Sequence, residues 1–206
     1  MISKGGMVDN YAKLAKDNLD RLYGNLPGDM EDRLPGEKKG RVYSFAAFGR
    51  SCSVSPAGIT LGSVEPPGVI AILLSLYALN ATTEIPLLEP LRAFKEFSGS
   101  APYVGAFASH TEQILVPAVH RIKTKFDLIL SRLSGEAAPP SVNGDFAFVV
   151  RPLPKIFLCY IFYEADEDFP PSVTCLYSHN ANRFMPMDGL ADVGEYTSKT
   201  ILELVG

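Results

Sequence analysis

The sequence predicts an α+β protein in which helices pack on an antiparallel sheet, and three observations lead to this class. The stretch 156–163, IFLCYIFY, contains neither a charge nor a glycine. Such a run is too short to cross a membrane and is typical of a strand that is covered on both faces. Turn-rich segments flank it and predict an antiparallel meander over about 145–186. Most of the remaining chain shows helical spacing of its apolar residues.

The length and composition of the chain are those of an ordinary globular domain. Of its 206 residues, 47% are hydrophobic and 20% are charged, and a chain of this size can bury a sizeable core. We therefore expect a single domain over residues 1–206. Within it, residues 1–62 can form a small N-terminal subdomain with a helix and a β-hairpin.

The charge and the apolar segments argue against nucleic-acid and membrane partners. The formal net charge is −4 and no run of basic residues occurs, whereas nucleic-acid binders usually carry a basic face. The N-terminal residues lack the apolar core of a secretory signal. The most apolar run, 69–79, is shorter than the ~18–20 residues of a membrane helix. We expect a cytoplasmic protein, and the sequence leaves its oligomeric state open.

The N-terminal third is predicted to contain two helices and several short strands. Residues 8–23 place apolar side chains at three- and four-residue spacing, with charged side chains mostly on the other side. Short strands are expected at 42–48, 51–54 and 59–61, where turn residues separate them. The segment near 67–80 opens with prolines and is apolar on nearly every face, which predicts the central buried helix.

The middle of the chain is predicted to be helical, and the C-terminal part to form the sheet and a last helix near 188–204. Helices are expected at about 102–109 and along the apolar stripe 119–133. Pro117 allows a helix to begin there or kinks one four residues earlier, because proline lacks an N–H. The strands of the meander are expected at 145–151, 156–163 and 173–177, with a short extended piece at 184–186.

The three cysteines are interpreted as reduced thiols, because an odd and sparse number does not suit a disulfide framework. Cys159 and Cys175 are equally far from Glu167, so a hairpin centred on Glu167 would place them opposite each other. Facing thiols can bind a soft metal or form a redox bond. The favoured interpretation is two small apolar side chains in the core, since no second cysteine pair completes a metal site.

The turn that follows 156–163 is dense in carboxylates, which can offer oxygen ligands to a hard cation or act in acid–base chemistry. The turn lacks the alternating ligand spacing and the glycine of a calcium loop. A solvated hairpin tip is the favoured interpretation, and a carboxylate that folds back towards Arg151 would be structural. The acidic residues are Glu164, Asp166, Glu167 and Asp168.

A second candidate lies in the predicted helix 102–109 and just beyond it. Tyr103, Phe107 and His110 follow helical spacing and can line a pocket, although a buried amphipathic stripe is the commoner meaning. The histidines lack the local pairing of a zinc site, so no metal is predicted. No phosphate-binding glycine loop or nucleophile elbow occurs, so no cofactor is predicted. The candidate ligand-binding residues are Tyr103, His110, Arg151, Glu164, Asp166, Glu167 and Asp168.

Several motifs carry a resemblance to a known family. They are GDFAF at 144–148, RPLP at 151–154, YEADEDFP at 163–170, ILL at 72–74 with Tyr77, and YVGAF at 103–107. In these motifs the chain resembles an uncharacterised prokaryotic family, a domain of unknown function found mainly in anaerobic bacteria and archaea. The likeness covers most of residues 60–206 and is most specific in the acidic turn.

The resemblance implies with which other proteins the family is associated, but it implies no reaction. Members of the family are sometimes joined to iron–sulfur modules or encoded near corrinoid-dependent methyl-transfer proteins. This chain has no cysteine-rich segment to hold such a cluster. It also departs from the family at Tyr163, where a tryptophan is common, and at Ser178, near which an acidic residue is usual. The family supplies no catalytic residues to carry over.

Two functional hypotheses follow from the sequence. The first is a non-catalytic accessory module that binds a small-molecule ligand or a protein partner, around one-carbon or corrinoid chemistry in an anaerobe. It rests on the resemblance and on the lack of an assignable nucleophile, metal set or phosphate loop. The alternative is a hydrolase or transferase that uses the acidic turn 164–168 with His110 in acid–base roles.

Overall fold

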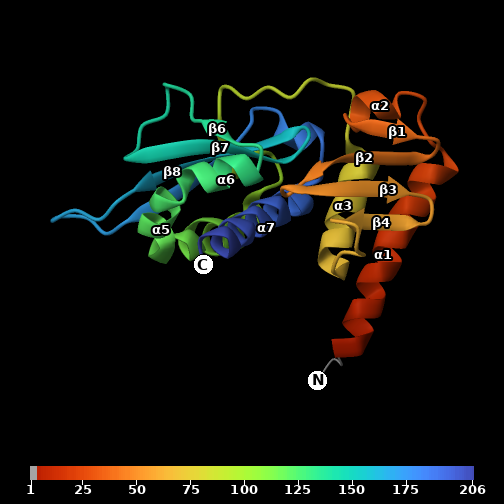
Figure 1. Ribbon diagram of the computed structural model, residues 1–206, viewed down its shortest axis with the longest axis horizontal. Helices are drawn as coiled ribbons and strands as arrows, with labels where there is room; N and C mark the ends of the chain where they lie inside the picture. Colours follow the sequence, from red (N-terminus) through yellow and green to blue (C-terminus); the bar gives the residue numbers. More distant parts are fainter. Residues whose placement is uncertain (1–3) are drawn as a thin grey trace.

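Two antiparallel sheets organise the part of the chain that the structure, a computed structural model, describes: residues 4–206, with side chains from residue 10 (Figure 1). The first sheet has the strand order β1-β2-β3-β4 and the second the order β5-β9-β8-β7-β6. The predicted α+β class is confirmed. The strands are β1 (Glu37–Lys39), β2 (Val42–Ala47), β3 (Arg50–Ser55), β4 (Gly58–Leu61), β5 (Arg92–Ala93), β6 (Glu136–Ala137), β7 (Phe146–Leu153), β8 (Ile156–Tyr163) and β9 (Ser172–Tyr177).

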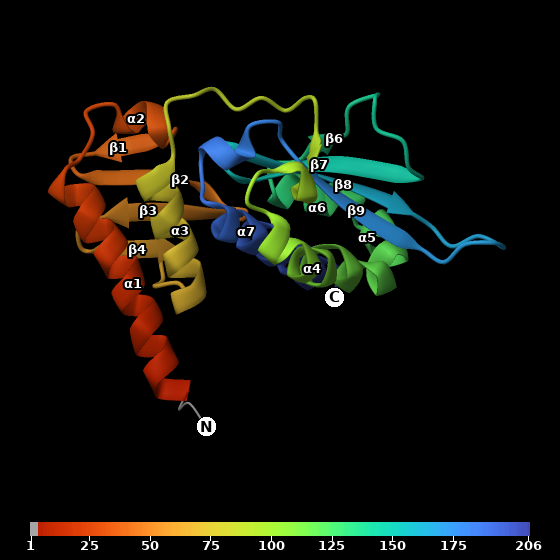
Figure 2. The same cartoon turned by 180° about the vertical axis from the view of Figure 1, so that it is seen from behind.

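Consecutive hairpins form the first sheet, and two helices pack beside it (Figure 2). These helices are α1 (Lys4–Gly24) and α3 (Gly68–Asn80), and the short helix α2 (Met30–Arg33) precedes β1. The two long helices approach so closely that a Cβ on Gly68 would lie 2.8 Å from the Cβ of Tyr11. The glycine at this position therefore allows the helices to pack, and α3 buries Leu73, Leu74 and Tyr77.

The second sheet has its strand β8 covered on both faces, as the sequence predicts. Every residue of β8 is buried except Tyr163 at its end. Helices cover one face, and segments 88–91 and 138–142 cover the other over Phe157, Cys159 and Ile161. The helices of this part are α4 (Val104–Phe107), α5 (Val119–Thr124), α6 (Phe126–Arg132) and the predicted C-terminal helix α7 (Met187–Val205).

The edges of this sheet differ from the prediction. The meander continues through β6, and β5 pairs with β9 at Leu176 and Tyr177. The extended piece expected at 184–186 joins neither sheet, because it follows a 3-10 turn, η5 (Ala181–Arg183), and leads directly into α7. As β5 has two residues and β9 has six, much of the outer edge of β9 pairs with no strand of residues 4–206.

The pairing of β8 with β9 is displaced by one residue from the predicted register. Tyr163 pairs with Ser172, so Cys175 lies opposite Tyr160 rather than opposite Cys159. Since neighbouring residues of a strand point to opposite faces, the two thiols lie on opposite faces of the sheet. The prediction of facing cysteines is wrong because the hairpin is centred between two residues and not on Glu167. All three cysteines are buried and free.

The segment before α5 departs from the regular helix predicted at 102–109. It passes through α4, a π-helical turn η3 (Ala108–Glu112) and a 3-10 stretch η4 (Gln113–Ala118). The change from the π-helical turn to the 3-10 stretch falls at Gln113, four residues before Pro117. In a regular helix the carbonyl of Gln113 would accept the N–H of residue 117, and proline has no N–H to donate. The change of helix type therefore lies at the position where Pro117 predicts a kink. Two further 3-10 turns, η1 (Phe94–Glu96) and η2 (Ala101–Tyr103), come earlier.

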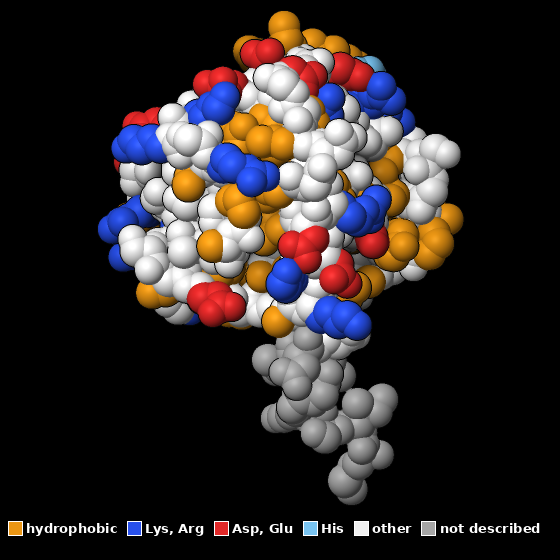
Figure 3. All heavy atoms as spheres, turned by 90° about the vertical axis from the view of Figure 1, so that its right-hand side faces the viewer, with side chains coloured by type: hydrophobic (Ala, Val, Ile, Leu, Met, Phe, Trp, Pro, Cys, Tyr) orange, Lys and Arg blue, Asp and Glu red, His pale blue; other side chains and the backbone are white. Residues whose placement is uncertain are grey.

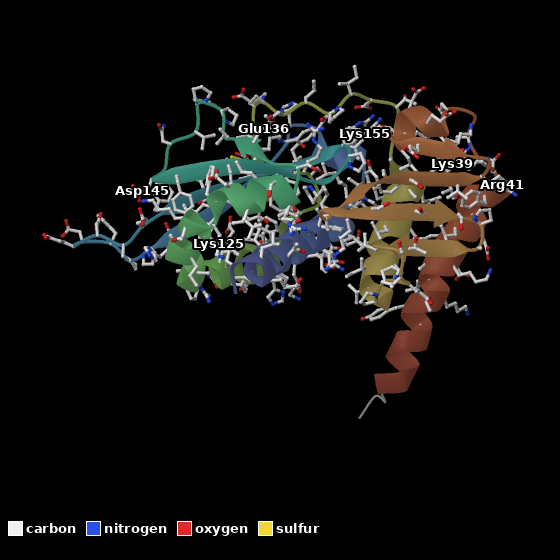
Figure 4. All side chains as sticks on the ribbon, in the orientation of Figure 1. Lys39, Arg41, Lys125, Glu136, Asp145 and Lys155 are labelled. Atoms are coloured by element: carbon white, nitrogen blue, oxygen red, sulfur yellow. The ribbon has the colours of Figure 1, made fainter. Side chains whose placement is uncertain are left out.

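A buried lysine fixes the connection between the two sheets. Lys155 lies in the turn between β7 and β8 and is 3% exposed, and Figure 4 places it between the sheets. Its ammonium donates hydrogen bonds to the carbonyls of Thr82 (2.6 Å) and Glu84 (3.1 Å). It also lies 5.6 Å from the centre of the Phe184 ring. The chain that leaves α3 is therefore attached to the second sheet by its backbone.

The surface of the first-sheet end carries charges of both signs. Figure 3 shows lysine, arginine and acidic side chains intermingled on this face around small groups of apolar side chains, a pattern typical of a solvent-exposed surface. Within residues 4–206, no helix combines the length and apolar character needed to cross a membrane.

Replacement of Lys155 by methionine is expected to destabilise the protein, because two carbonyls of the connection lose their donor. We expect the free energy of unfolding to fall by about 1–3 kcal/mol, the typical cost of unsatisfied buried groups. Urea unfolding followed by circular dichroism measures it. Lys39→Met is the matched control, since that side chain is 85% exposed and should change stability little. Equal stability of K155M and the wild type would contradict this role.

Candidate functional site

The acidic turn lies at the tip of the β8–β9 hairpin, which projects beyond the helices (Figure 1). Asp166, Glu167 and Asp168 are exposed. The Oδ1 of Asp166 accepts the backbone N–H groups of Asp168 (2.9 Å) and Phe169 (2.7 Å), so this carboxylate shapes the turn. Glu164 pairs with Lys123 of α5. These carboxylates hold the hairpin tip and its attachment to a helix.

Arg151 lies elsewhere, near the far end of β7 from this turn. Its guanidinium stacks over Phe157, 4.4 Å from the ring centre, and its side chain is exposed. Lys123, and not Arg151, is thus the basic residue that a carboxylate of the turn reaches. Arg151 covers part of the small apolar cluster on the outer face of the sheet.

His110 and Tyr103 are also separate from the acidic turn. The Nδ1 of His110 lies 3.1 Å from Glu195 Oε2 on α7, and Lys199 donates to the other oxygen of Glu195 at 2.5 Å. Burial would raise the pKa of Glu195, but Lys199 and His110 lower it overall. Tyr103 is half-buried against the core. The structure does not bring His110 together with residues 164–168.

One pocket does form beside the helix on which the sequence places a candidate site. It has a volume of about 250 Å³ and lies between the segment after β5, the α4–η3 helix and the edge strand β9. Phe107 of the predicted stripe lines it, whereas Tyr103 and His110 do not. The residues of this Glu112 pocket are Ala93, Phe94, Lys95, Val104, Phe107, Ala108, Glu112, Thr174 and Cys175.

Glu112 reaches the pocket because of the π-helical turn. This turn ends at Glu112 and carries its side chain to the part of the β9 edge that β5 leaves open. There Oε1 accepts the backbone N–H of Cys175 at 2.9 Å. The carboxylate thus takes the place of a carbonyl from a missing neighbouring strand, and wide helical turns of this kind are frequent at functional sites.

The surroundings of Glu112 are mainly apolar. The rings of Phe94 and Phe107 stack with their centres 4.5 Å apart. Burial raises the pKa of Glu112, and this outweighs the hydrogen bond from Cys175 and the positive charge of Lys95, which lower it. Burial also raises the pKa of the Cys175 thiol well above its usual value. The pocket therefore presents a strong hydrogen-bond acceptor and a neutral, unreactive thiol.

The sequence names Phe107 as a pocket residue but not Glu112. The one signal for Glu112 is Pro117, which predicts a break near residue 113 and hence an irregular turn beside it. The open edge of β9 depends on the length of β5, which lies about eighty residues earlier in the chain. Among the described residues, no group of three or more histidine, cysteine or acidic side chains is arranged to hold a metal ion.

Comparison with known proteins identifies the family. The model of the domain of unknown function DUF3786 matches residues 27–200. The chain belongs to this family. The match includes the first sheet, which the motif resemblance over 60–206 covers only in part, and it includes every residue of the Glu112 pocket. None of the curated proteins or solved structures compared with the chain matches it.

Substitutions at Glu112 are expected to separate its hydrogen bond from its charge. Glu112→Gln keeps an oxygen for the N–H of Cys175, whereas Glu112→Ala removes it and should destabilise by about 1 kcal/mol. The folded protein binds a proton more readily at Glu112 than the unfolded chain does. Between the unfolded pKa near 4.5 and the raised folded pKa, wild-type stability should therefore fall as pH rises, relative to E112Q.

Urea unfolding of the wild type and of both variants from pH 4 to 7 measures this effect. Differences of more than about 0.6 kcal/mol in the free energy of unfolding are large enough to interpret. The advantage of E112Q should be smallest at the acid end and grow towards neutral pH. Parallel stability curves for E112Q and the wild type would show that Glu112 is not perturbed by burial.

Proposed function

We propose that the protein is a non-catalytic binding module and that the Glu112 pocket is its ligand site. The observation that carries the proposal is the half-buried carboxylate of Glu112 in an apolar pocket. Within residues 10–206, its one hydrogen bond is the one that it accepts from the N–H of Cys175. A carboxylate in such surroundings has accepting capacity left over, and a ligand donor that uses it offsets part of the free-energy cost of burial. Pockets with apolar walls and few convergent polar groups are typical of small-molecule sites.

The lining favours a flat ligand with N–H donors. The stacked rings of Phe94 and Phe107 supply an aromatic wall, Glu112 an acceptor and Lys95 a positive charge at the rim. The family resemblance suggests one-carbon or corrinoid chemistry in an anaerobe. Among carriers of one-carbon units, a folate has this character, since its pterin ring presents adjacent N–H groups and its tail carries carboxylates. We therefore propose an accessory protein that holds a folate-type molecule.

The open edge of β9 favours a protein partner as the second candidate. Strand β9 pairs with β5 only at Leu176 and Tyr177, so an extended peptide can add to the remaining edge by main-chain hydrogen bonds. Such a peptide would displace the side chain of Glu112 from the N–H of Cys175. The two candidates therefore use Glu112 in opposite ways.

A ligand screen by thermal shift, followed by calorimetry, tests the proposal. The panel contains tetrahydrofolate, a free pterin, cobalamin and divalent metals. We expect the folate and the pterin to raise the melting temperature of the wild type. E112A should bind them at least about tenfold more weakly, because a hydrogen bond to a charged group is lost.

Glu167→Gln is the matched control, because it removes an exposed carboxylate at the hairpin tip and should leave binding unchanged. Stabilisation by cobalamin alone would replace the folate with a corrinoid as the ligand class. If no member of the panel binds, or if E112A binds as well as the wild type, the pocket is not a site for these molecules.

A further inference from the structure

A glycine of α7 lies directly behind the aromatic wall of the Glu112 pocket. Gly194 is buried and stands well inside this long helix. After proline, glycine is the least favourable residue in a helix interior, because its backbone loses the most conformational freedom there. Helix formation therefore gives no reason for a glycine at this position, and the reason has to come from what the helix packs against.

Three side chains crowd the position that a Cβ on Gly194 would occupy. Such an atom would lie 2.6 Å from Cε2 of Phe107, 2.9 Å from the hydroxyl oxygen of Tyr177 and 3.0 Å from Oγ1 of Thr111. Two carbon atoms that are not bonded normally lie about 3.5–4.0 Å apart. The glycine therefore sets how closely α7 approaches these side chains. They belong to α4, η3 and β9, three of the elements that line the Glu112 pocket.

Phe107 connects this contact to the pocket. Its side chain lines the pocket and is 5% exposed. Its ring stacks on Phe94, with the centres 4.5 Å apart, and is tilted against Tyr177 at 5.8 Å. Tyr177 is itself held in place, since its hydroxyl donates to the carbonyl of Leu190 on α7 at 2.6 Å. Because these neighbours are closely packed, a ring that is displaced from α7 moves into the open volume of the pocket.

We propose that Gly194 sets the size of the Glu112 pocket, and with it the size of the ligand, by allowing Phe107 to lie against α7. A methyl group at position 194 would push the ring into a pocket of about 250 Å³. A ligand with two fused rings should then lose its place before a ligand with one ring does. Gly194 is a positioning residue, since it acts through Phe107. The effect on ligands rests on the function proposed above, whereas the position of the ring does not.

Calorimetry of the full chain with free pterin and with isocytosine tests the proposal. The two molecules present the same adjacent N–H groups, but pterin has two fused rings and isocytosine has one. We expect the wild type to bind both. Gly194→Ala should bind pterin at least about tenfold more weakly, whereas its affinity for isocytosine should change by less than about twofold. A general loss of packing would weaken the binding of both molecules alike.

Phe107→Leu shows whether the effect passes through the ring. Leucine is shorter than phenylalanine, so adding G194A to F107L should change the affinity for pterin by less than about threefold, and the two substitutions are then coupled. Gly189→Ala is the matched control. Gly189 is also buried in α7, but the three atoms nearest to a Cβ there all belong to Met185. The flexible side chain of Met185 can move aside, so G189A should bind pterin like the wild type.

Crystal structures of the wild type and of G194A without ligand separate this proposal from the proposed function. We expect the ring of Phe107 to be displaced into the pocket in G194A. The proposal is overturned if the ring keeps its place, or if G194A weakens the binding of pterin and isocytosine equally. If the ring is displaced but neither molecule binds the wild type, the proposed ligand class is wrong, while the control of the pocket by Gly194 stands.

Discussion

Coverage of β8 on both faces is the constraint on which the rest of this structure depends. The backbone hydrogen bonds of β8 are made with β7 and β9, but its apolar side chains need to be covered on each face of the sheet. Helices supply one cover with the main core, and chain segments without regular structure supply the other. Part of that second cover belongs to the connection between the two sheets, so the connection has to be fixed in place, and Lys155 does this.

The Glu112 pocket lies where the regular secondary structure around this core ends. The Glu112 pocket forms because β5 ends after two residues and leaves the edge of β9 to a side chain. A hollow of about 510 Å³ also forms where the β2–β3 hairpin of the first sheet meets the end of α6.

Local pattern is sufficient to predict the elements that the core requires. The sequence predicts β8 from its unbroken apolar run, α3 from its apolar faces and α7 from its apolar stripe. It also predicts the break before Pro117. The register between β8 and β9 is harder to predict, because a displacement of one residue depends on the geometry of the turn that joins the strands. The sequence therefore predicts that Cys159 and Cys175 face each other, whereas they lie on opposite faces of the sheet.

The Glu112 pocket escapes sequence pattern. Glu112 is an ordinary charged residue in the sequence, and it becomes distinctive only through its contact with Cys175 on β9, far along the chain. The acidic turn has the opposite character, because its density of charge is conspicuous in the sequence while the structure uses it to shape a hairpin tip. Charge density by itself is thus a weaker guide to a site than an unmatched donor or acceptor.

The tight turn at Phe48 and Gly49, between β2 and β3, joins the two halves of the molecule. The ring of Phe48, in the first half, packs edge-to-face against Tyr196 in the second half. The N–H of Phe48 donates to the carbonyl of Pro152, which also belongs to the second half. A foreign module can replace one half only if Phe48 and the residues that surround its ring are transferred together. A hybrid protein that respects the boundary between the sheets but mismatches this joint would carry an empty hole on one side and an exposed ring on the other.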